Sequence, residues 1–404
     1  MKISKVEAFL LSYAFDEPLK MRFWGGERTI FKRDAMLIRV TADNGLKGYA
    51  PGPADMGAQR EISGEIASFL DGRDPLKWRE FGLDSLTYYP VEIALIDLAA
   101  KYEGAPMSEL IGGRKRDRIK LYGSAGMYMS PTGYAEEAAA IQEMGFCAYK
   151  LRPAAGPEAD LETVRQIREA TGEGFGVMLD AHGWWRMGDR SYSPDMIEQL
   201  ARDVSRYSPT WLEEPLPPED HAAYRELRSK KILPLASGEH EPDEAGFLEL
   251  IDSGCVDYVQ ADVCCQGGFE MGRRIFEACA RADVRFAFHC WGTLLEVIVA
   301  AQLGVCWDED VVEWLEYPCY ANGGRAGMYA NPPADEILKH PLEIDGSELV
   351  VPSEPGLGVE VDESVIEKYP FLPGPWSVFQ IDSPPETLAL SGDLSVAWSA
   401  SDTR

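Results

Sequence analysis

The sequence predicts an α/β fold, a modified (β/α) barrel of the TIM type that carries an α+β capping domain. Short apolar runs and helical patterns alternate between residues 120 and 316, with a spacing of roughly 25 to 30 residues. The apolar runs are continuous, as expected of parallel strands that are buried on both faces. Acidic and histidine residues end several of these runs, and a closed barrel gathers the carboxyl ends of its strands at one mouth.

The barrel strands are expected at eight apolar runs, the number that closes a TIM barrel. In chain order they are IKLYG, AYKL, FGVMLD, TWLEE, LPLASGE, DYVQAD, RFAFH and VVEWLE. Between them lie segments such as ADLETVRQIREAT and SPDMIEQLARDVSRY, where apolar residues recur every three or four positions and predict helices. Ser193 and Pro194 suit the N-cap and the first position of the second helix.

The start of the chain follows another pattern. The alternating runs ISKVEAFLLSYA and AMLIRVTADNGLKGYA predict antiparallel strands, and the second run turns at residues 43–45. Helical patterns follow at residues 61–72 and 91–104. We therefore expect a capping domain at 1–116 and a barrel at 117–350. A C-terminal segment at 351–404 would complete the cap and end in a tail, without clear periodicity, that wraps a neighbouring subunit or is partly disordered.

Length and charge limit the function classes. A chain of 404 residues suits a barrel of about 250 residues with a second, smaller domain. The formal net charge of −28 argues against nucleic acid and against anionic membrane surfaces as partners. An acidic substrate stays possible because a bound cation can reverse the local field. We find no secretory leader and no apolar run of about 18 residues, so we expect a soluble cytoplasmic protein. Its cysteines are then expected to be reduced thiols.

Three carboxylates end successive strands of the expected barrel. Asp180, Glu213 and Glu239 occupy the strings VMLDAHG, TWLEEP and LASGEH. Oxygen ligands of this kind bind Mg²⁺ or Mn²⁺ rather than zinc. His182, His240 and His289 lie next to these ligands or at another strand end, an arrangement suited to proton transfer beside a cation. For His240, substrate contact and a structural role both remain open.

These motifs, WLEEP above all, resemble the enolase superfamily, in particular its mandelate racemase and muconate lactonizing enzyme group. The resemblance extends to about Tyr369. It implies an essential Mg²⁺ held by Asp180, Glu213 and Glu239, with the first glutamate of WLEEP as the ligand and Glu214 behind it. It also implies a small-molecule carboxylate substrate and self-association into a homo-oligomer.

The same resemblance implies roles for further residues. Asp262 and His289 match an Asp-His dyad in which the carboxylate orients a basic imidazole. Glu316 matches a residue that hydrogen-bonds the substrate carboxylate, and Lys150 matches the first lysine of a Lys-x-Lys motif. Arg152 replaces the second lysine. Because arginine stays protonated, a racemase that needs a second base at this position is disfavoured.

The string Asp180-Ala181-His182 is most similar to the group's acid-sugar dehydratases. In that interpretation His289 removes the α-proton of a sugar acid, the metal stabilises the enediolate, and His182 protonates the departing β-hydroxyl to give a 2-keto-3-deoxy acid. Lys150 and Arg152 supply positive charge. The alternative is a cycloisomerase or an epimerase that uses the same enolate, and FHCWGT is closer to the group's cycloisomerases. A non-catalytic metal-binding protein is a third alternative, which the intact acidic and histidine residues disfavour.

Substrate choice in this family depends on two loops of the capping domain. The first is expected near residues 20–28, where Arg22, Trp24 and Arg28 would meet hydroxyls or a distal carboxylate of a sugar acid. A solvated glycine-rich turn is the equal alternative. The second, near residues 51–59, lacks the glutamate that the family often carries.

Overall fold

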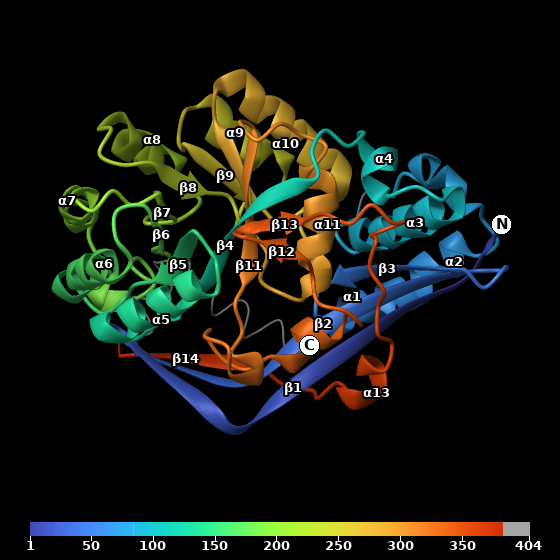
Figure 1. Ribbon diagram of the computed structural model, residues 1–404, viewed down its shortest axis with the longest axis horizontal. Helices are drawn as coiled ribbons and strands as arrows, with labels where there is room; N and C mark the ends of the chain where they lie inside the picture. The colour runs from blue at the N-terminus through green and yellow to red at the C-terminus, as the bar shows by residue number, and fades with distance from the viewer. Residues whose placement is uncertain (84, 383–404) are drawn as a thin grey trace.

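The computed structural model describes residues 1–83 and 85–382. Eight parallel strands form a closed barrel, with β11 paired to β4 (Figure 1). The strands are β4 (Arg118–Met127), β5 (Ala148–Arg152), β6 (Gly176–Asp180), β7 (Trp211–Glu213), β8 (Leu235–Ser237), β9 (Tyr258–Ala261), β10 (Arg285–Phe288) and β11 (Val312–Pro318). Each overlaps one of the eight runs that predicted it. The TIM-type fold class is confirmed.

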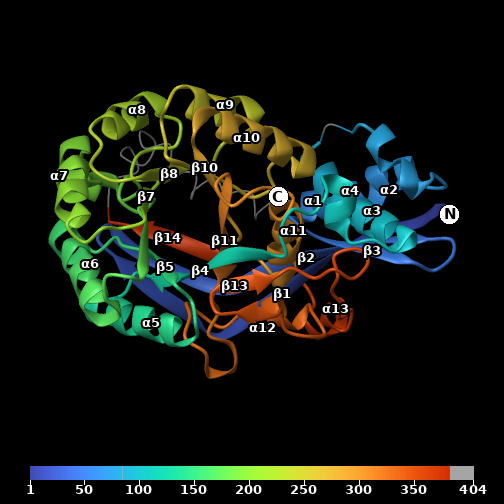
Figure 2. The same ribbon diagram turned by 45° about the horizontal axis from the view of Figure 1, so that its top comes forward.

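Helices surround the barrel as an outer ring (Figure 2). They are α5 (Pro131–Glu143), α6 (Pro157–Thr171), α7 (Pro194–Ser205), α8 (His221–Ser229), α9 (Glu244–Asp252), α10 (Gly268–Ala282) and α11 (Leu294–Gly304). Ser193 caps α7 as predicted, since its hydroxyl accepts the Met196 N–H at 3.3 Å. The sequence analysis did not single out α11, whose residues are buried on nearly every side and therefore show no amphipathic period.

The capping domain contains a four-stranded antiparallel sheet. Strand β2 (Gly26–Ala42) pairs on one edge with β1 (Ile3–Phe23), and on the other with β3 (Lys47–Gly52) and β14 (Ser377–Ile381). The helices of this domain are α1 (Met56–Glu61), a π-helical turn (Ile62–Ile66), α2 (Ala67–Leu70), a 3₁₀ segment (Pro75–Glu80), α3 (Tyr88–Glu103) and α4 (Met107–Ile111). The cap is therefore α+β and includes the C-terminal segment, as predicted.

Short elements complete the chain. The hairpin β12 (Ile344–Asp345) and β13 (Glu348–Val350) adds antiparallel to β4. The helices α12 (Pro332–Glu336) and α13 (Val365–Lys368) and two 3₁₀ turns (Gly188–Arg190, Asn322–Gly324) lie in connections. The prediction for the end of the tail falls on residues 383–404, outside the described part of the chain. None of the helices in the described part is long and apolar enough to cross a membrane.

One expectation about the cap needs correction. Residues 20–28 are not a long loop but the closed end of the β1–β2 hairpin, with Phe23 paired to Gly26. Strand β14 supports this end by pairing with β2 from Gly26 to Ile30. That partner comes from the far end of the chain, so no local pattern could reveal it. In Figure 1 the hairpin runs beneath the barrel with β14 beside it.

The barrel interior begins with an apolar layer to which every strand contributes one residue. Its members form a buried cluster: Tyr122, Ala148, Met178, Trp211, Ala236, Tyr258, Ala287 and Trp314. Side chains alternate along a strand, so the residue two positions later also points inward, one layer closer to the carboxyl end. This layer closes the barrel from below and forms the floor of the site.

Candidate active site

The layer above the apolar floor is charged. Two positions beyond floor residues lie Lys150, Asp180, Glu213 and Glu316 on four strands, and His289 directly after β10. The sequence places them there because the pleat repeats every two residues. These five side chains therefore lie in one layer at the carboxyl end of the barrel interior.

The three predicted metal ligands come together. Asp180, Glu213 and Glu239 can each place a carboxylate oxygen within 4.8 Å of the others. Asp180 and Glu213 are paired in register on β6 and β7, and Glu239 follows β8. Burial raises the pKa of Glu213 to about 8. The charge of Lys150 opposes this rise, and the charges of Asp180 and Glu239 add to it. A hard divalent cation would relieve this repulsion, so the all-oxygen donor set fits Mg²⁺ or Mn²⁺.

Lys150 supplies the positive charge beneath the triad. Its fully buried Nζ lies 2.8 Å from Glu213 Oε1, 2.9 Å from Glu316 Oε1 and 3.8 Å from Asp180 Oδ2. Burial opposes its charge, but Glu213, Glu316 and Asp180 outweigh burial and raise the pKa of Lys150. These three carboxylates therefore favour the protonated form of the side chain.

Arg152 and Glu316 are held in the same network. Arg152 Nε lies 3.1 Å from Asp180 Oδ2, and its Nη1 donates to the Ala125 carbonyl at 2.8 Å. Glu316 is fully buried, contacts Lys150 and accepts the Cys290 N–H at 3.0 Å. The charge of Lys150 works against burial to lower the pKa of Glu316. Glu316 therefore positions Lys150 in this structure, and its hydrogen bond to a substrate carboxylate stays a prediction.

His182 and His289 contact the two outer ligands of the triad. His182 Nδ1 is 2.5 Å from Asp180 Oδ1, and His289 Nε2 is 3.3 Å from Glu239 Oε2. Both side chains are mostly buried, with 13% and 17% of their surface exposed. The two imidazoles therefore border the triad on the β6 side and on the β8 side.

The Asp262–His289 dyad is present but loosely engaged. Asp262 Oδ2 lies 3.6 Å from His289 Nδ1, beyond hydrogen-bond distance, while Asp262 Oδ1 accepts the Cys264 N–H at 2.9 Å. Burial opposes the charged imidazole, but Glu239 and Asp262 prevail and raise the pKa of His289 to about 10. Because Glu239 contributes most of this rise, a cation that neutralises Glu239 would return His289 towards the pKa of a base that works near neutrality.

His240 is tied into a hydrogen-bonded chain next to the triad. Its Nδ1 lies 2.7 Å from Glu214 Oε2, and Arg186 Nη2 donates to its Nε2 at 3.0 Å. Arginine cannot accept a hydrogen bond, so Nε2 carries the lone pair and Nδ1–H donates to Glu214. Both ring nitrogens are thereby occupied. This supports the structural role over the substrate-contact role that the sequence left open.

Of the two residues predicted at the tip of the capping hairpin, Arg22 is exposed to solvent and Trp24 packs against the connection after β5. Arg22 is 87% exposed at its side chain and faces Glu27, so the structure does not bring it to the site. Trp24 is 39% exposed and packs against Gly156, after β5. Its N–H donates to Ala154 and its carbonyl accepts from Arg190. Trp24 therefore fixes the hairpin over the barrel mouth.

Sequence reasoning missed three residues near the site. Arg186 orients His240, and the ring of Trp291 lies 4.2 Å from the Arg152 guanidinium carbon. Glu296 forms a capping box with Thr293 at the start of α11. Burial, together with Asp262, raises the pKa of Glu296 to about 8. The Thr-x-x-Glu spacing after FHCWG is a helix-start signature that could have revealed Glu296. Trp291 lies within the FHCWGT string itself, whereas Arg186 lies in a loop without a pattern.

Comparison with known proteins identifies the family. The model of the enolase C-terminal domain-like family matches residues 133–365, more than half of the chain. The chain belongs to the enolase superfamily. Its resemblance to the mandelate racemase and muconate lactonizing enzyme group is confirmed.

Several superfamily members are similar over most of their length. D-galactarolactone cycloisomerase of Agrobacterium fabrum is 27% identical over 390 residues, covering 91% of this chain and 99% of that protein. D-galactonate dehydratase of Xanthomonas euvesicatoria is 27% identical, covering 84% and 92%. The solved 3,6-anhydro-D-galactonate cycloisomerase of Zobellia galactanivorans superposes with a TM-score of 0.76 at 27% identity, covering 91% and 99%. The superfamily relatives thus include both dehydratases and cycloisomerases.

Proposed function

We propose that this superfamily enzyme is a Mg²⁺-dependent acid-sugar dehydratase that converts a sugar acid to a 2-keto-3-deoxy acid. The observation that carries the proposal is the position of the two imidazoles, one against Asp180 and the other against Glu239, at opposite ends of the carboxylate triad. Elimination of water needs one group to take a proton and another to give one. Two histidines on either side of the substrate position meet that need.

His289 is the proposed base. Its Nε2 faces the triad while its Nδ1 faces Asp262, so Nε2 receives the α-proton and Asp262 supports the resulting imidazolium. Bound among the three carboxylates, Mg²⁺ would supply positive charge that acidifies the α-hydrogen of a chelating hydroxy acid. The charges of Lys150 and Arg152 help to lower the pKa values of Asp180 and Glu316 against the effect of burial.

His182 is the proposed acid. Its Nδ1 is directed at Asp180, which leaves Nε2 free to protonate the β-hydroxyl as the C–O bond breaks and water departs. The enol that remains takes up a proton at the β-carbon and becomes the keto acid. Arg152 is held by Asp180, the Ala125 carbonyl and the Ser124 hydroxyl and stays charged, which disfavours a second base at that position.

A cycloisomerase is the second candidate, and relatives at 27% identity with nearly full coverage favour it. It would use His289 and the same enolate with a sugar lactone, but would lose no water. The discriminating experiment incubates the Mg²⁺-loaded protein with a panel of mono- and diacid sugars and with their lactones. A 2-keto-3-deoxy product from an acyclic sugar acid is expected. Efficient isomerisation of a lactone or epimerisation of an acid, with no keto-deoxy product from any compound, would contradict the dehydratase.

A further inference from the structure

Gln260 is a polar side chain inside the barrel whose amide group has no hydrogen-bond partner. The residue is on β9 and is fully buried. Within the part of the chain that the structure describes, neither its Oε1 atom nor its Nε2 atom is hydrogen-bonded. The amide can donate two hydrogen bonds and accept two more, and leaving all of them unmade in the interior is costly. A group of this kind calls for a polar ligand.

The alternation of side chains along β9 directs Gln260 into the charged layer of the site. Val259 and Ala261 belong to the core that the strands share with the surrounding helices, whereas Tyr258 belongs to the apolar floor inside the barrel. Gln260 comes two positions after Tyr258, so it points inward, one layer above the floor. It therefore occupies the same layer as the five charged side chains described above.

The neighbouring strands offer the amide group of Gln260 no polar side chain in register. On β10 the residue paired with it is Ala287. On the other side Gly238 follows β8 with a φ of 137°, and a Cβ atom there would lie 2.3 Å from the Gln260 carbonyl oxygen. The next groups beyond these small residues are Glu239 and His289, which contact each other at 3.3 Å. Gln260 thus lies between the strand that leads to a ligand of the triad and the strand that leads to the proposed base.

Another fully buried glutamine, Gln302 on α11, shows how a purely structural amide is bonded in this protein. Its Nε2 donates to the carbonyls of Pro352 and Leu357, each at 3.1 Å. Its Oε1 accepts the Ser108 N–H at 3.1 Å. Gln302 is therefore satisfied by the backbone around it, whereas Gln260 directs an open amide into the site.

We propose that Gln260 binds an oxygen atom of the substrate carboxylate, at the end of the substrate that chelates the cation and becomes the enediolate. The Nε2–H group of Gln260 donates to this oxygen, whose negative charge grows as His289 removes the α-proton. The hydrogen bond strengthens as the charge develops, so it lowers the barrier to proton removal and also holds the substrate. No proton is transferred to or from Gln260. The inference rests on the proposed function only in that a carboxylate is chelated at the triad.

The test uses oxalate, a planar dianion that resembles the enediolate in shape and charge. Calorimetry measures its binding to the Mg²⁺-loaded native protein and to Gln260→Met, which keeps an unbranched side chain but removes the amide. We expect oxalate to bind about tenfold to a hundredfold more weakly to the variant, the range for a hydrogen bond to a charged group. The affinity for Mg²⁺ alone should stay within about twofold, because the proposed ligand of Gln260 is the carboxylate and not the cation.

Thermal unfolding of the metal-free protein separates this role from a structural one. Gln260→Met should not lower the melting temperature, because it removes a polar group that has no partner in the fold. Gln302→Met is the matched control. It removes three hydrogen bonds, so it should lower the melting temperature and leave the oxalate affinity within about twofold. Gln260→Leu replaces Gln260→Met if the latter fails to fold.

Three outcomes would overturn the inference. Equal oxalate affinities of the native protein and Gln260→Met would mean that the amide holds a buried water only. A loss of affinity for Mg²⁺ alone would assign Gln260 to the cation. A melting temperature lowered as far as in Gln302→Met would show that the amide is a structural group. The proposed function is tested separately, because oxalate cannot lose water: failure of every sugar acid to give a keto-deoxy product would leave the oxalate result unchanged.

Discussion

The Nζ atom of Lys150 lies 2.8 Å from Oε1 of Glu213, and both side chains are fully buried inside the barrel. This contact joins the positive charge of Lys150 to a ligand of the proposed cation. Removal of the lysine would leave Glu213 and Glu316 buried without their nearest positive partner.

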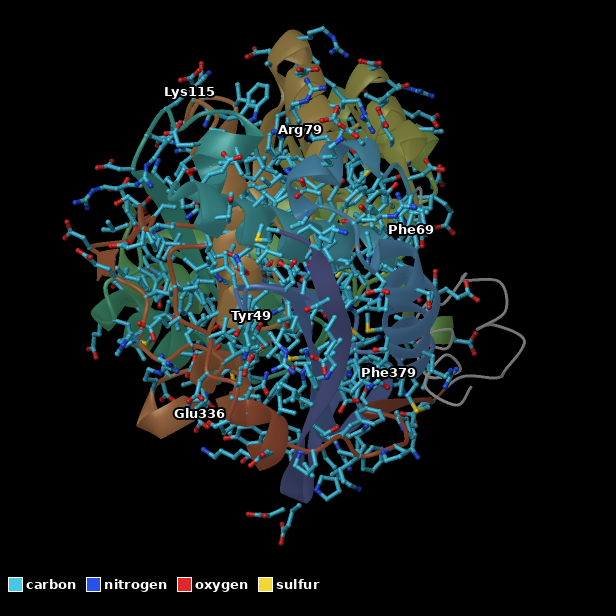
Figure 3. The ribbon with its side chains drawn as sticks, turned by 90° about the vertical axis from the view of Figure 1, so that its right-hand side faces the viewer. Tyr49, Phe69, Arg79, Lys115, Glu336 and Phe379 are labelled. Atoms are coloured by element: carbon cyan, nitrogen blue, oxygen red, sulfur yellow. The ribbon has the colours of Figure 1, made fainter. Side chains whose placement is uncertain are left out.

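Lys150→Met is therefore expected to destabilise the metal-free protein by about 3 to 5 kcal/mol, the range for breaking a buried ion pair. Chemical denaturation in the presence of a chelator measures the change. Lys115→Met is the matched control, because Lys115 (labelled in Figure 3) is 49% exposed and its ion pair is with the exposed Asp308. The control should shift stability by less than about 0.5 kcal/mol. Equal effects of the two variants would refute the role assigned to Lys150.

Binding of Mg²⁺ should raise the melting temperature of the native protein, because a ligand that binds only the folded state stabilises it. At a concentration of about 100 times its Kd, the gain is about 2.7 kcal/mol. Glu213→Gln should remove the gain and the activity while the fold survives, since a barrel core does not depend on its mouth. Glu309→Gln, at an exposed carboxylate, serves as the control. Undiminished activity after exhaustive chelation would refute the assignment of a metal site.

The two histidines should separate the two halves of the reaction. His289→Asn is expected to abolish both turnover and exchange of the substrate α-hydrogen with deuterated solvent. His182→Asn should block loss of the β-hydroxyl but retain exchange, because His289 is untouched. Proton NMR follows the exchange, and a keto-acid assay follows the elimination. Exchange that persists in His289→Asn would move the base elsewhere.

Arg152→Lys tests the reason for disfavouring a second base. The native arginine contacts Asp180 at 3.1 Å and remains charged, whereas a lysine at this position can release a proton. Epimerisation of a hydroxy acid is expected in this variant and not in the native protein, as measured by chiral chromatography. Efficient epimerisation by the native protein would contradict the argument.

Glu363 should make stability depend on acid pH. Its carboxylate accepts hydrogen bonds from Arg39, Lys47 and Tyr49 (labelled in Figure 3), which link the C-terminal segment to β2 and β3. Burial opposes ionisation, but these bonds prevail and lower the pKa of Glu363 to about 2. The depressed pKa stabilises the fold above the unfolded value of 4.5, and this gain is lost as the pH falls towards 2.

We expect Glu363→Gln to cost about 1 to 2 kcal/mol at pH 7, a figure reduced for partial exposure, and much less at pH 3. Urea denaturation at both pH values measures the difference. A cost that is the same at pH 3 and pH 7 would rule out the ionic origin.

The sequence by itself determined the barrel and the three carboxylates of the triad. The eight strands were visible because parallel strands buried on both faces are continuous apolar runs. Asp180 and the pair Glu213–Glu214 were visible because strand ends meet at one mouth, and the resemblance to the enolase superfamily chose Glu213 of that pair. The enolase superfamily followed from the same strings, and the family comparison agrees.

Only the tertiary structure decided what surrounds those groups. Glu316 proved to be bound to Lys150, and His240 to lie between Glu214 and Arg186. These contacts join residues from different strands and loops, so no local spacing encodes them. The pairing of β14 with β2 joins residues more than 300 positions apart and buries Arg28 between two rings. Burial and partner choice are properties of the packed chain, so only the tertiary structure could place Arg28 in the interior and leave Arg22 exposed.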